Sequence, residues 1–350
     1  MSSRSASGKR AAERPPSRLA KNRVGTSHHR ALSLWGVVAA LVIVGFAAEL
    51  LSIAELGPRW LDQAGAVAIT AGFTTALAAR TGGRPVVAGV LAGLYGAVAV
   101  VWGNETVLAG AAIGSAVVTS VLAVMLTVPA ARFRYAAREM LISLAVAGVG
   151  AFAVVGMRPQ VSLDAFDFVT LGLAFALALG LVYRLGAGFH GAGRRGVVML
   201  LVGTVLVILA ITYAEVFRRY GSPGLLEPVF DAVSWWRAEF GAVPRPTVVF
   251  VGVPGLVWGC HMRARRRQGW WVAIFGVAAS ANVATVLLNP ATGWLEALLI
   301  VVYSVLPGLA LGYAVVRLDQ RLTGPRGARA RRAEEALAVR PEPRRFSPLL

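Results

Sequence analysis

The 350-residue chain is 57% hydrophobic and only 15% charged, whereas soluble globular proteins carry roughly a quarter charged residues. This composition excludes an ordinary soluble fold and predicts a protein whose solvent is lipid. The formal charge of +18 lies beside and between apolar stretches, so it indicates orientation in a membrane and attraction to anionic lipids, and it argues against nucleic-acid binding.

Apolar stretches recur along nearly the whole chain at about the 20 residues that cross the hydrocarbon layer as a helix. We therefore predict an all-α, polytopic transmembrane helical bundle of about ten spans. The spans are Ala31–Ala54, Leu61–Ala79, Pro85–Trp102, Val107–Val128, Met140–Met157, Phe168–Tyr183, Val197–Phe217, Thr247–Met262, Trp270–Leu288 and Trp294–Val316. The second and eighth are the weakest, because they are short and contain Thr, Gly or Pro.

Arginines in the links between spans set the predicted orientation, because basic residues of short loops stay in the cytoplasm. Alternate links are basic, and 29 of the 35 basic residues fall on one side if the chain has ten spans. Both termini are then cytoplasmic. Removing one span would invert every later link. Arginine far outnumbers lysine, and Ala, Gly and Val dominate, which is typical of a high-GC bacterial genome and predicts a bacterial cell membrane protein.

Two basic tails flank the predicted transmembrane domain of residues 31–317. Residues 1–30 and 318–350 are rich in Arg, Ala and Pro and contain few apolar side chains. Such segments cannot bury enough apolar surface to offset the entropy of ordering. We predict that both are disordered and cytoplasmic.

Residues 221–245 differ from the other links, because apolar residues recur there at helical spacing. Leu226, Phe230, Val233 and Trp236 would share one helix face, with acidic residues elsewhere on the turn. We predict an extracytoplasmic amphipathic helix. It could be a connector lying on lipid or a lid over an external cavity, and the tryptophans favour the membrane interface.

Acidic residues are the first functional candidates within the spans, since a charge at the membrane centre costs about 2.5 to 3.5 kcal/mol on insertion scales. Glu215 and Glu296 each lie within an apolar stretch, toward its outward end. Either could bind a substrate or act as a base on a lipid-linked one. The alternative is that both reach the interface and pair with Arg218 or Arg219.

The last three spans contain the other candidate binding residues. Pro254 and Pro307 lie inside predicted spans, where proline removes a backbone hydrogen bond and breaks or kinks the helix. Between them, Asn282 and Thr285 share a helix face at a spacing of three. Broken helices and buried amides form substrate sites in transporters. The same features also fit ordinary interhelical hydrogen bonding.

No cofactor or metal site is predicted, because the chain has one cysteine and lacks phosphate-binding glycine loops and zinc-ligand spacings. We favour a permease for a small molecule or lipid precursor, and hence transport over catalysis. The alternatives are an extracytoplasmic enzyme acting on a lipid-linked substrate and a noncatalytic membrane assembly subunit. The expected partners are membrane lipids and a small or lipid-linked substrate.

Overall fold

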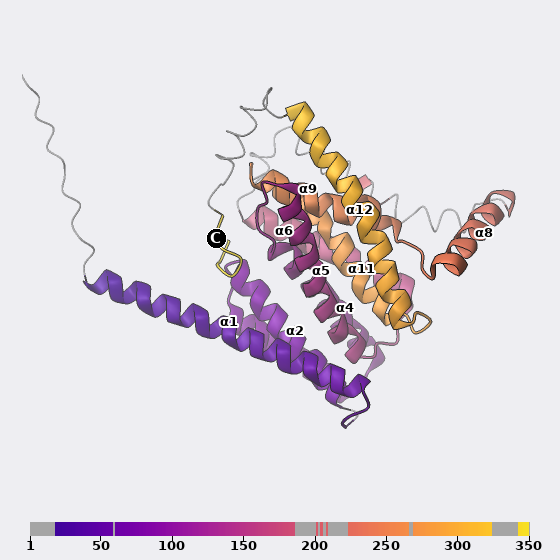
Figure 1. Cartoon of the computed structure of the whole chain (residues 1–350). Coiled ribbons are helices and arrows are strands. Elements are labelled where there is room, and N and C mark those ends of the chain that lie inside the picture. The colour runs from indigo at the N-terminus through magenta and orange to yellow at the C-terminus, as the bar shows by residue number, and fades with distance from the viewer. Residues whose placement is uncertain are drawn as a thin grey trace, which may run out of the picture.

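The computed structural model describes residues 18–58, 60–185, 223–265, 269–323 and 342–349, together with positions 201, 204, 205 and 208. Within these ranges all regular secondary structure is helical (Figure 1). The helices are α1 (Arg18–Ile53), α2 (Leu61–Arg80), α3 (Pro85–Trp102), α4 (Glu105–Met125), α5 (Phe133–Gly156), α6 (Leu163–Arg184), α8 (Pro223–Phe240), the π-helical η1 (Val248–Gly252), α9 (Val253–Arg263), α10 (Gly269–Ala273), the 3-10 turn η2 (Ile274–Gly276), α11 (Val277–Leu288) and α12 (Trp294–Thr323).

Seven stretches of the described chain are long and apolar enough to cross a membrane: Ser33–Ile53, α3, α4, α5, α6, Gly269–Leu288 and Trp294–Leu322. The second and eighth predicted spans, which are the weakest by sequence, are not long and apolar enough to be counted among these seven. The second is α2, and the eighth is the shorter apolar helix Val248–Arg263. Most of the predicted seventh span lies outside the described residues. Ten spans and cytoplasmic termini therefore stay predictions, whereas an all-helical protein with several membrane-spanning helices is confirmed.

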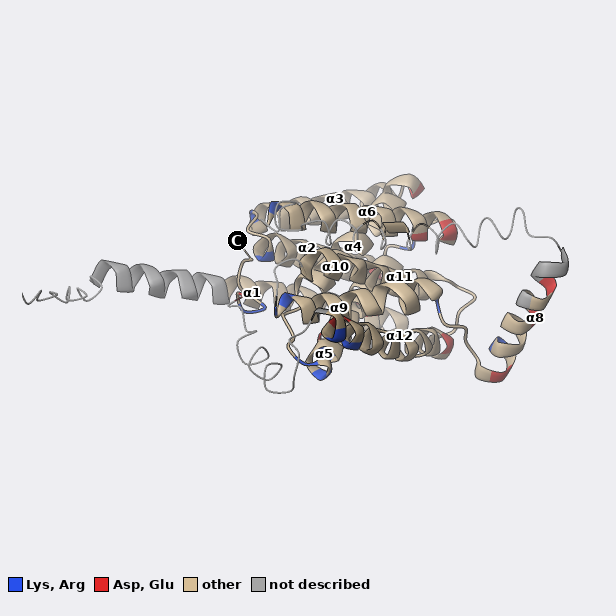
Figure 2. Cartoon of the chain, turned by 90° about the horizontal axis from the view of Figure 1, so that it is seen from above, with Lys and Arg blue, Asp and Glu red and all other residues tan. Residues whose placement is uncertain are grey.

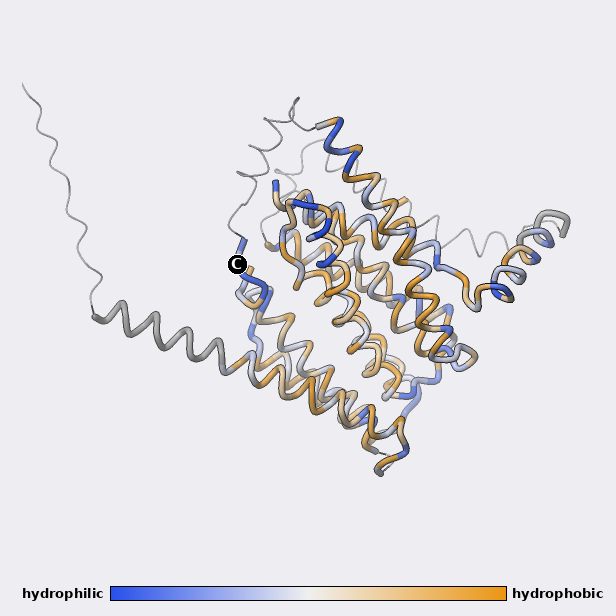
Figure 3. Tube along the Cα trace, viewed as in Figure 1, coloured by the Kyte–Doolittle hydropathy of each residue, from blue (hydrophilic) through white to orange (hydrophobic). Residues whose placement is uncertain are grey.

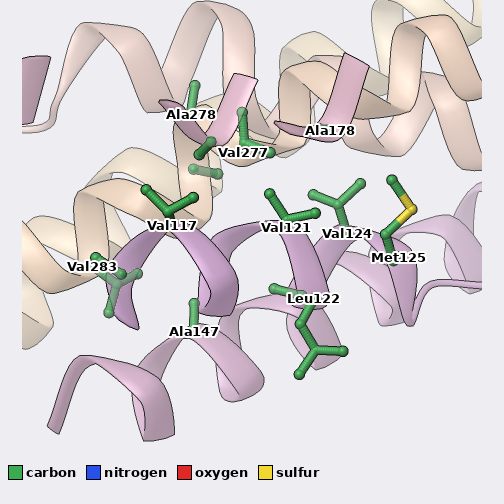
Figure 4. Packing of buried hydrophobic residues seen from close by; sticks show 14 of the residues in the cluster. Val117, Val121, Leu122, Val124, Met125, Ala147, Ala178, Val277, Ala278 and Val283 are labelled. Carbon is green, nitrogen blue, oxygen red and sulfur yellow. The ribbon is translucent and has the colours of Figure 1, made fainter. Parts of the chain in front are cut away.

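The core lies where α4, α5, α6 and α11 meet, and its side chains are small or branched. Figure 4 shows Val121 and Val124 of α4 facing Val277 and Ala278 of α11, with Ala178 of α6 nearby. All five are buried in one apolar cluster. Small side chains let helix backbones approach closely, and close packing drives helix association in lipid, where the hydrophobic effect between helices is lost.

Helix α2 lies inside the protein despite its modest hydropathy, because α1, α3, α4 and α5 pack around it. Its hydroxyl groups are bonded within the bundle. Thr70 Oγ1 donates to Ala66 O at 2.8 Å and lies 2.9 Å from Ser115 Oγ of α4. A polar helix is tolerated at membrane depth where neighbouring helices satisfy its polar groups. This enclosure explains why α2 is the weakest span by composition.

Glycines bring η1 against α11 and α9 against α10 at backbone distance. A Cβ added to Gly252 would lie 2.5 Å from Ala279 N, and one added to Gly259 would lie 2.5 Å from Ala273 Cα. Gly308 of α12 packs against the side chain of Val253 of α9, whose Cβ would lie 2.8 Å from an added Cβ. The G-x-x-x-G spacing in these helices thus forms real contacts, since only a residue without a Cβ permits this approach.

Charged side chains gather at the two ends of the bundle (Figure 2). Helix ends at one side, which we term the basic end, carry Arg80, Arg132, Arg138, Arg184, Arg263 and Arg321. Helix ends at the other side, which we term the acidic end, carry Glu49, Asp62, Glu105, Asp164, Asp167 and Glu296. Between them the helices are mostly apolar, as the orange stretches of Figure 3 show. This distribution has the form expected of helices that cross a membrane.

Helix α8 extends away from the acidic end of the bundle (Figures 1 and 2). It occupies most of the predicted amphipathic segment 221–245. Its described side chains are exposed, and large apolar ones among them include Phe230, Val233 and Trp235. Arg237 connects α8 to the bundle by an ion pair with Glu296.

Two parts of the predicted C-terminal tail, residues 318–323 and 342–349, are among the described residues. Helix α12 continues to Thr323, seven residues past the predicted end of the last span at Val316. Residues 342–349 then lie against the basic end beside α2, where the yellow trace ends in Figure 1. At the other terminus, α1 begins at Arg18, within the segment predicted to be disordered.

Candidate functional site

The centre of the candidate site is the helical span Gly269–Leu288, which includes α11. It is the most enclosed of the seven spans, with 83% of its most apolar stretch buried. Ser280, Asn282 and Thr285 are nevertheless polar, and each is at most 3% exposed. A buried polar group is costly unless hydrogen-bonded, so the partners of these side chains define the site.

Asn282 and Thr285 lie together in a network with two charged residues. Arg245, in the link between α8 and η1, donates from Nη1 to Asn282 Oδ1 at 2.7 Å. The same nitrogen lies 3.6 Å from Asp167 Oδ2 of α6. Thr285 Oγ1 donates to Asp167 Oδ1 at 2.7 Å. We term Arg245, Asp167, Asn282 and Thr285 the Arg245 cluster. The Arg245 cluster confirms no function. It does join Asn282 and Thr285, the two residues of α11 that the sequence predicts to bind a substrate, to an ion pair.

Further hydrogen bonds fix the Arg245 cluster to the helices around it. Asn282 Nδ2 donates to Thr247 Oγ1 at 3.1 Å and to Ala278 O at 2.6 Å. The backbone N–H of Arg245 donates to Ser304 Oγ of α12 at 2.8 Å. The cluster therefore connects α6, α11, α12 and the chain entering η1. Movement of any one of these elements would break a bond to another.

The ion pair of the cluster is only partly shielded from solvent. The side chains of Arg245 and Asp167 are 28% and 32% exposed. Burial lowers the pKa of Arg245, and the nearby Asp167 carboxylate acts in the opposite direction. Arg245 and Asp167 thus form a pair of opposite charges that solvent can reach. An entering ligand would meet one positive and one negative group with amide and hydroxyl groups beside them.

A small cavity lies beside Arg245 and Asn282, and its walls are otherwise mainly apolar. Val248, Val283 and Val301 line it, together with Ser304. The enclosed space is about 10 Å³, which is room for about one water molecule. The cavity therefore has no room for a solute larger than about one water molecule, and a larger one could enter it only if the surrounding helices separated.

The structure does not bring the two prolines into this cluster. Pro254 is buried in α9, and its Cα lies 3.5 Å from a Cβ added to Gly312 of α12. Before it, the chain forms a π-helical turn in which Val253 N–H donates to Val248 O. Pro307 lies on an exposed face of α12, which remains helical throughout. Proline therefore coincides with an irregular helix at the first position only.

Of the two predicted acidic candidates, Glu296 is described and Glu215 lies outside the described residues. Glu296 Oε1 accepts a hydrogen bond from Arg237 Nη2 of α8 at 2.5 Å. Its side chain is 21% exposed at the acidic end. Glu296 therefore joins α8 to the start of α12, and it is not part of the Arg245 cluster.

A second charged group at the acidic end contains Glu49, Asp62 and Arg158. Arg158 pairs with Asp62, with Nη2 and Oδ2 at 2.5 Å. Glu49 of α1 is 1% exposed, and its Oε1 has no hydrogen-bond partner among the described groups. Its carboxyl group lies directly on Gly156 of α5, which leaves no room for a Cβ there. Glu49 is thus buried although it lies near the outward end of its helix.

Arg245 and Asp167 are the residues of the site that sequence analysis did not select. In the sequence both are simply charges near the ends of spans. One signal was available, because Arg245 stands between Pro244 and Pro246 immediately before an apolar helix. Two prolines restrict the backbone on either side of the arginine and hold it at the helix entrance.

Comparison with known proteins supplies no further assignment. No family model matches the chain, and no curated protein or solved structure matches it significantly. The function is therefore argued from the geometry of the site.

Proposed function

We propose that the protein is a permease of the cell membrane that binds a small zwitterionic or neutral solute at the Arg245 cluster. The observation that carries this proposal is the ion pair and amide network on the most enclosed membrane helix. Arg245 and Asp167 lie at the acidic end of the bundle and are 28% and 32% exposed, so a solute arriving from that side meets both charges. A structural role alone would be served at lower cost by apolar packing.

The cluster has the complementary charges that a zwitterion requires. A carboxylate can bind the guanidinium of Arg245 through two parallel hydrogen bonds, and an ammonium group can bind Asp167. The 3.6 Å separation of Arg245 and Asp167 is longer than a direct charge-assisted hydrogen bond, so their mutual bond is weak and replaceable. Asn282, Thr285 and Thr247 supply neutral donors and acceptors at the same place.

The helices around the cluster support alternating access. The π-helical η1 passes beside α11, where Gly252 contacts Ala279, and irregular helix beside a binding site is a feature of transporters. The backbone N–H of Arg245 donates to Ser304 of α12, so a solute that moved Arg245 would disturb the contact between α12 and the chain entering η1. The one-water cavity represents the closed state of this cycle.

Solute binding is testable on purified protein with a panel of zwitterionic, anionic, cationic and neutral solutes. We expect zwitterionic solutes to raise the thermal unfolding temperature of the wild-type protein, because a ligand that binds only the folded state stabilises it by about 2.7 kcal/mol at 100 times its Kd. Arg245→Gln and Asn282→Ala should abolish the shift. Arg237→Gln is the matched control, since Arg237 also pairs with an acid at the same end but lies outside the cluster.

Active solutes should then enter proteoliposomes that contain the wild-type protein and not those with Arg245→Gln. The proposal would be refuted if every solute of the panel left the unfolding temperature unchanged. It would also be refuted if the shift survived both cluster substitutions.

The second candidate is a noncatalytic assembly subunit, and the dense packing around α11 favours it. The cavity beside Asn282 holds about one water molecule. A subunit of this kind needs no solute pathway. It would copurify with a partner in constant ratio and would show no solute-dependent unfolding temperature or uptake.

A further inference from the structure

The basic end of the bundle holds a peptide that the composition of the tail did not suggest. Residues 342–349 cross the ends of α2, α4, α5 and α9, although 18 residues separate them from the end of α12. The segment has no helix of its own. Three arginines hold it in place. Arg80 and Arg263 of the bundle bond to the segment, and Arg345 of the segment bonds to the bundle.

Arg80 is the first of these contacts. It lies at the end of α2 but is fully buried. Its Nε donates to Met125 O of α4 at 3.0 Å, and its Nη1 donates to Arg344 O at 2.8 Å and to Ser347 O. In return, Leu349 N–H donates to Arg80 O at 2.8 Å. One guanidinium thus connects α4 to two carbonyl groups of the segment.

Arg263 of α9 makes the second contact and is also fully buried. Its Nη2 donates to Glu342 Oε2 at 2.7 Å and to Thr127 O at 3.0 Å. Its Nη1 donates to Thr127 Oγ1 at 2.8 Å. The guanidinium carbon lies 3.5 Å from the centre of the Trp270 ring, a distance that favours cation–π attraction. Glu342 supplies the negative charge that this buried cation needs.

Arg345 makes the third contact with reversed polarity, since here the segment provides the cation. Its Nη2 lies 2.9 Å and 2.8 Å from the two carboxylate oxygens of Glu139, which is fully buried. Its Nη1 donates to Leu126 O at 2.9 Å. Phe346 adds an apolar contact with Trp35 of α1, with ring centres 4.9 Å apart. The segment therefore carries one charge of each sign to a buried partner of opposite sign.

These contacts cover the inner surface where α4, α5 and α9 meet. Thr127, beneath Arg263, is fully buried. Cys260, the one cysteine of the chain, is also fully buried and lies one turn before Arg263 in α9. Its carbonyl oxygen accepts from Ala130 N–H at 3.0 Å. The layers from the solvent inward are thus the C-terminal segment, Arg263 with Thr127, and Cys260.

We infer that residues 342–349 form a releasable plug that closes the basic end of the bundle. The segment is held mainly by ion pairs and hydrogen bonds at a water-facing end, and salt weakens such contacts. Its 18-residue connection to α12 keeps it at high local concentration, so a short segment is sufficient to occupy the site. For a permease, which is the function on which this role rests, the plug would control access from the basic side.

Cys260 provides a native reporter of plug release. We expect N-ethylmaleimide to label Cys260 slowly in the full chain. In a chain that ends at Pro341, labelling should be at least about tenfold faster. A tenfold change corresponds to a loss of ~1.4 kcal/mol in the free energy that keeps the plug in place. Glu342→Gln combined with Arg345→Gln should have the same direction of effect without shortening the chain. Higher salt should accelerate labelling of the wild-type protein and leave the truncated protein unchanged.

Two further variants separate plug release from general unfolding. Cys260→Ser gives the background. Ala147→Cys in that background places a thiol in the apolar core on α5, eight residues along the helix from Glu139, and Ala147 is fully buried. Faster labelling of Cys260 with continued protection at position 147 supports the plug. Unchanged labelling at Cys260 refutes it. Faster labelling at both positions also refutes it, because the segment would then be a structural staple. No solute is required, so the result is independent of the transport assay.

Discussion

Gly259→Ala should lower the free energy of unfolding by about 3 kcal/mol, at the upper end of the usual cost of overpacking. The added Cβ would lie 2.5 Å from Ala273 Cα and closer still to the backbone nitrogen of Ala273. Backbone atoms of a neighbouring helix cannot turn away as a side chain can. Helix α9 would therefore move from α10, and the Gly252 and Gly255 contacts along the same interface would open with it.

Thermal or denaturant unfolding of the purified protein measures this effect. The matched control is Gly114→Ala, because Gly114 lies in α4 with no heavy atom within 4 Å of an added Cβ. Alanine should be neutral there or stabilising by up to about 1 kcal/mol through its higher helix propensity. Equal stabilities of the two variants would mean that α9 and α10 are not packed at backbone distance.

Glu139→Ala is the second large expected effect, with a loss of about 3 kcal/mol or more of folding free energy. Glu139 is fully buried, and its carboxylate accepts hydrogen bonds from Arg345 and from Val128 N–H. Removing one partner of a buried ion pair leaves the other charge without compensation, which usually costs about 3 to 5 kcal/mol. Here Arg345 can partly regain water, because its side chain is 18% exposed, so the lower part of this range is expected.

Arg138→Ala is the internal control for Glu139. Arg138 pairs with the same carboxylate at 3.1 Å, but its side chain is 59% exposed. Exposed ion pairs contribute about 0 to 1 kcal/mol, so this variant should unfold almost as the wild type does. If Arg138→Ala and Glu139→Ala had the same stability, the buried contact with Arg345 would contribute little, and the plug would lose one of its three attachments.

How apolar a predicted span is in the sequence corresponds to whether lipid or protein surrounds that helix in the structure. Helix α3 is strongly apolar and exposes most of its side chains, as a lipid-facing helix does. Helix α2 is weakly apolar because protein encloses it, with Thr70 bonded to α4. Hydropathy measures compatibility with lipid and not depth in the protein, so the least exposed helices can be among the hardest to recognise.

The candidate site was only partly predictable for a similar reason. Asn282 and Thr285 could be selected because amides and hydroxyls within an apolar helix need partners. Their charged partners could not be selected, since Arg245 and Asp167 are far apart in the chain and look like ordinary loop and helix-end charges. The pairing of Glu296 with Arg237 was equally hidden, because the sequence suggested Arg218 or Arg219 as its partner instead.

Local composition by itself determined that this protein is a helical membrane protein with charge at the helix ends, because the cost of placing backbone and charge in lipid acts on each segment separately. It also identified the polar face of α11. Only the tertiary structure decided that Arg245 and Asp167 meet that face, that α2 is enclosed, and that Glu342 and Arg345 reach buried partners. Those contacts depend on which helices are neighbours. The packing of the whole bundle selects the neighbours, and the sequence of one segment describes only one of the surfaces that pack together.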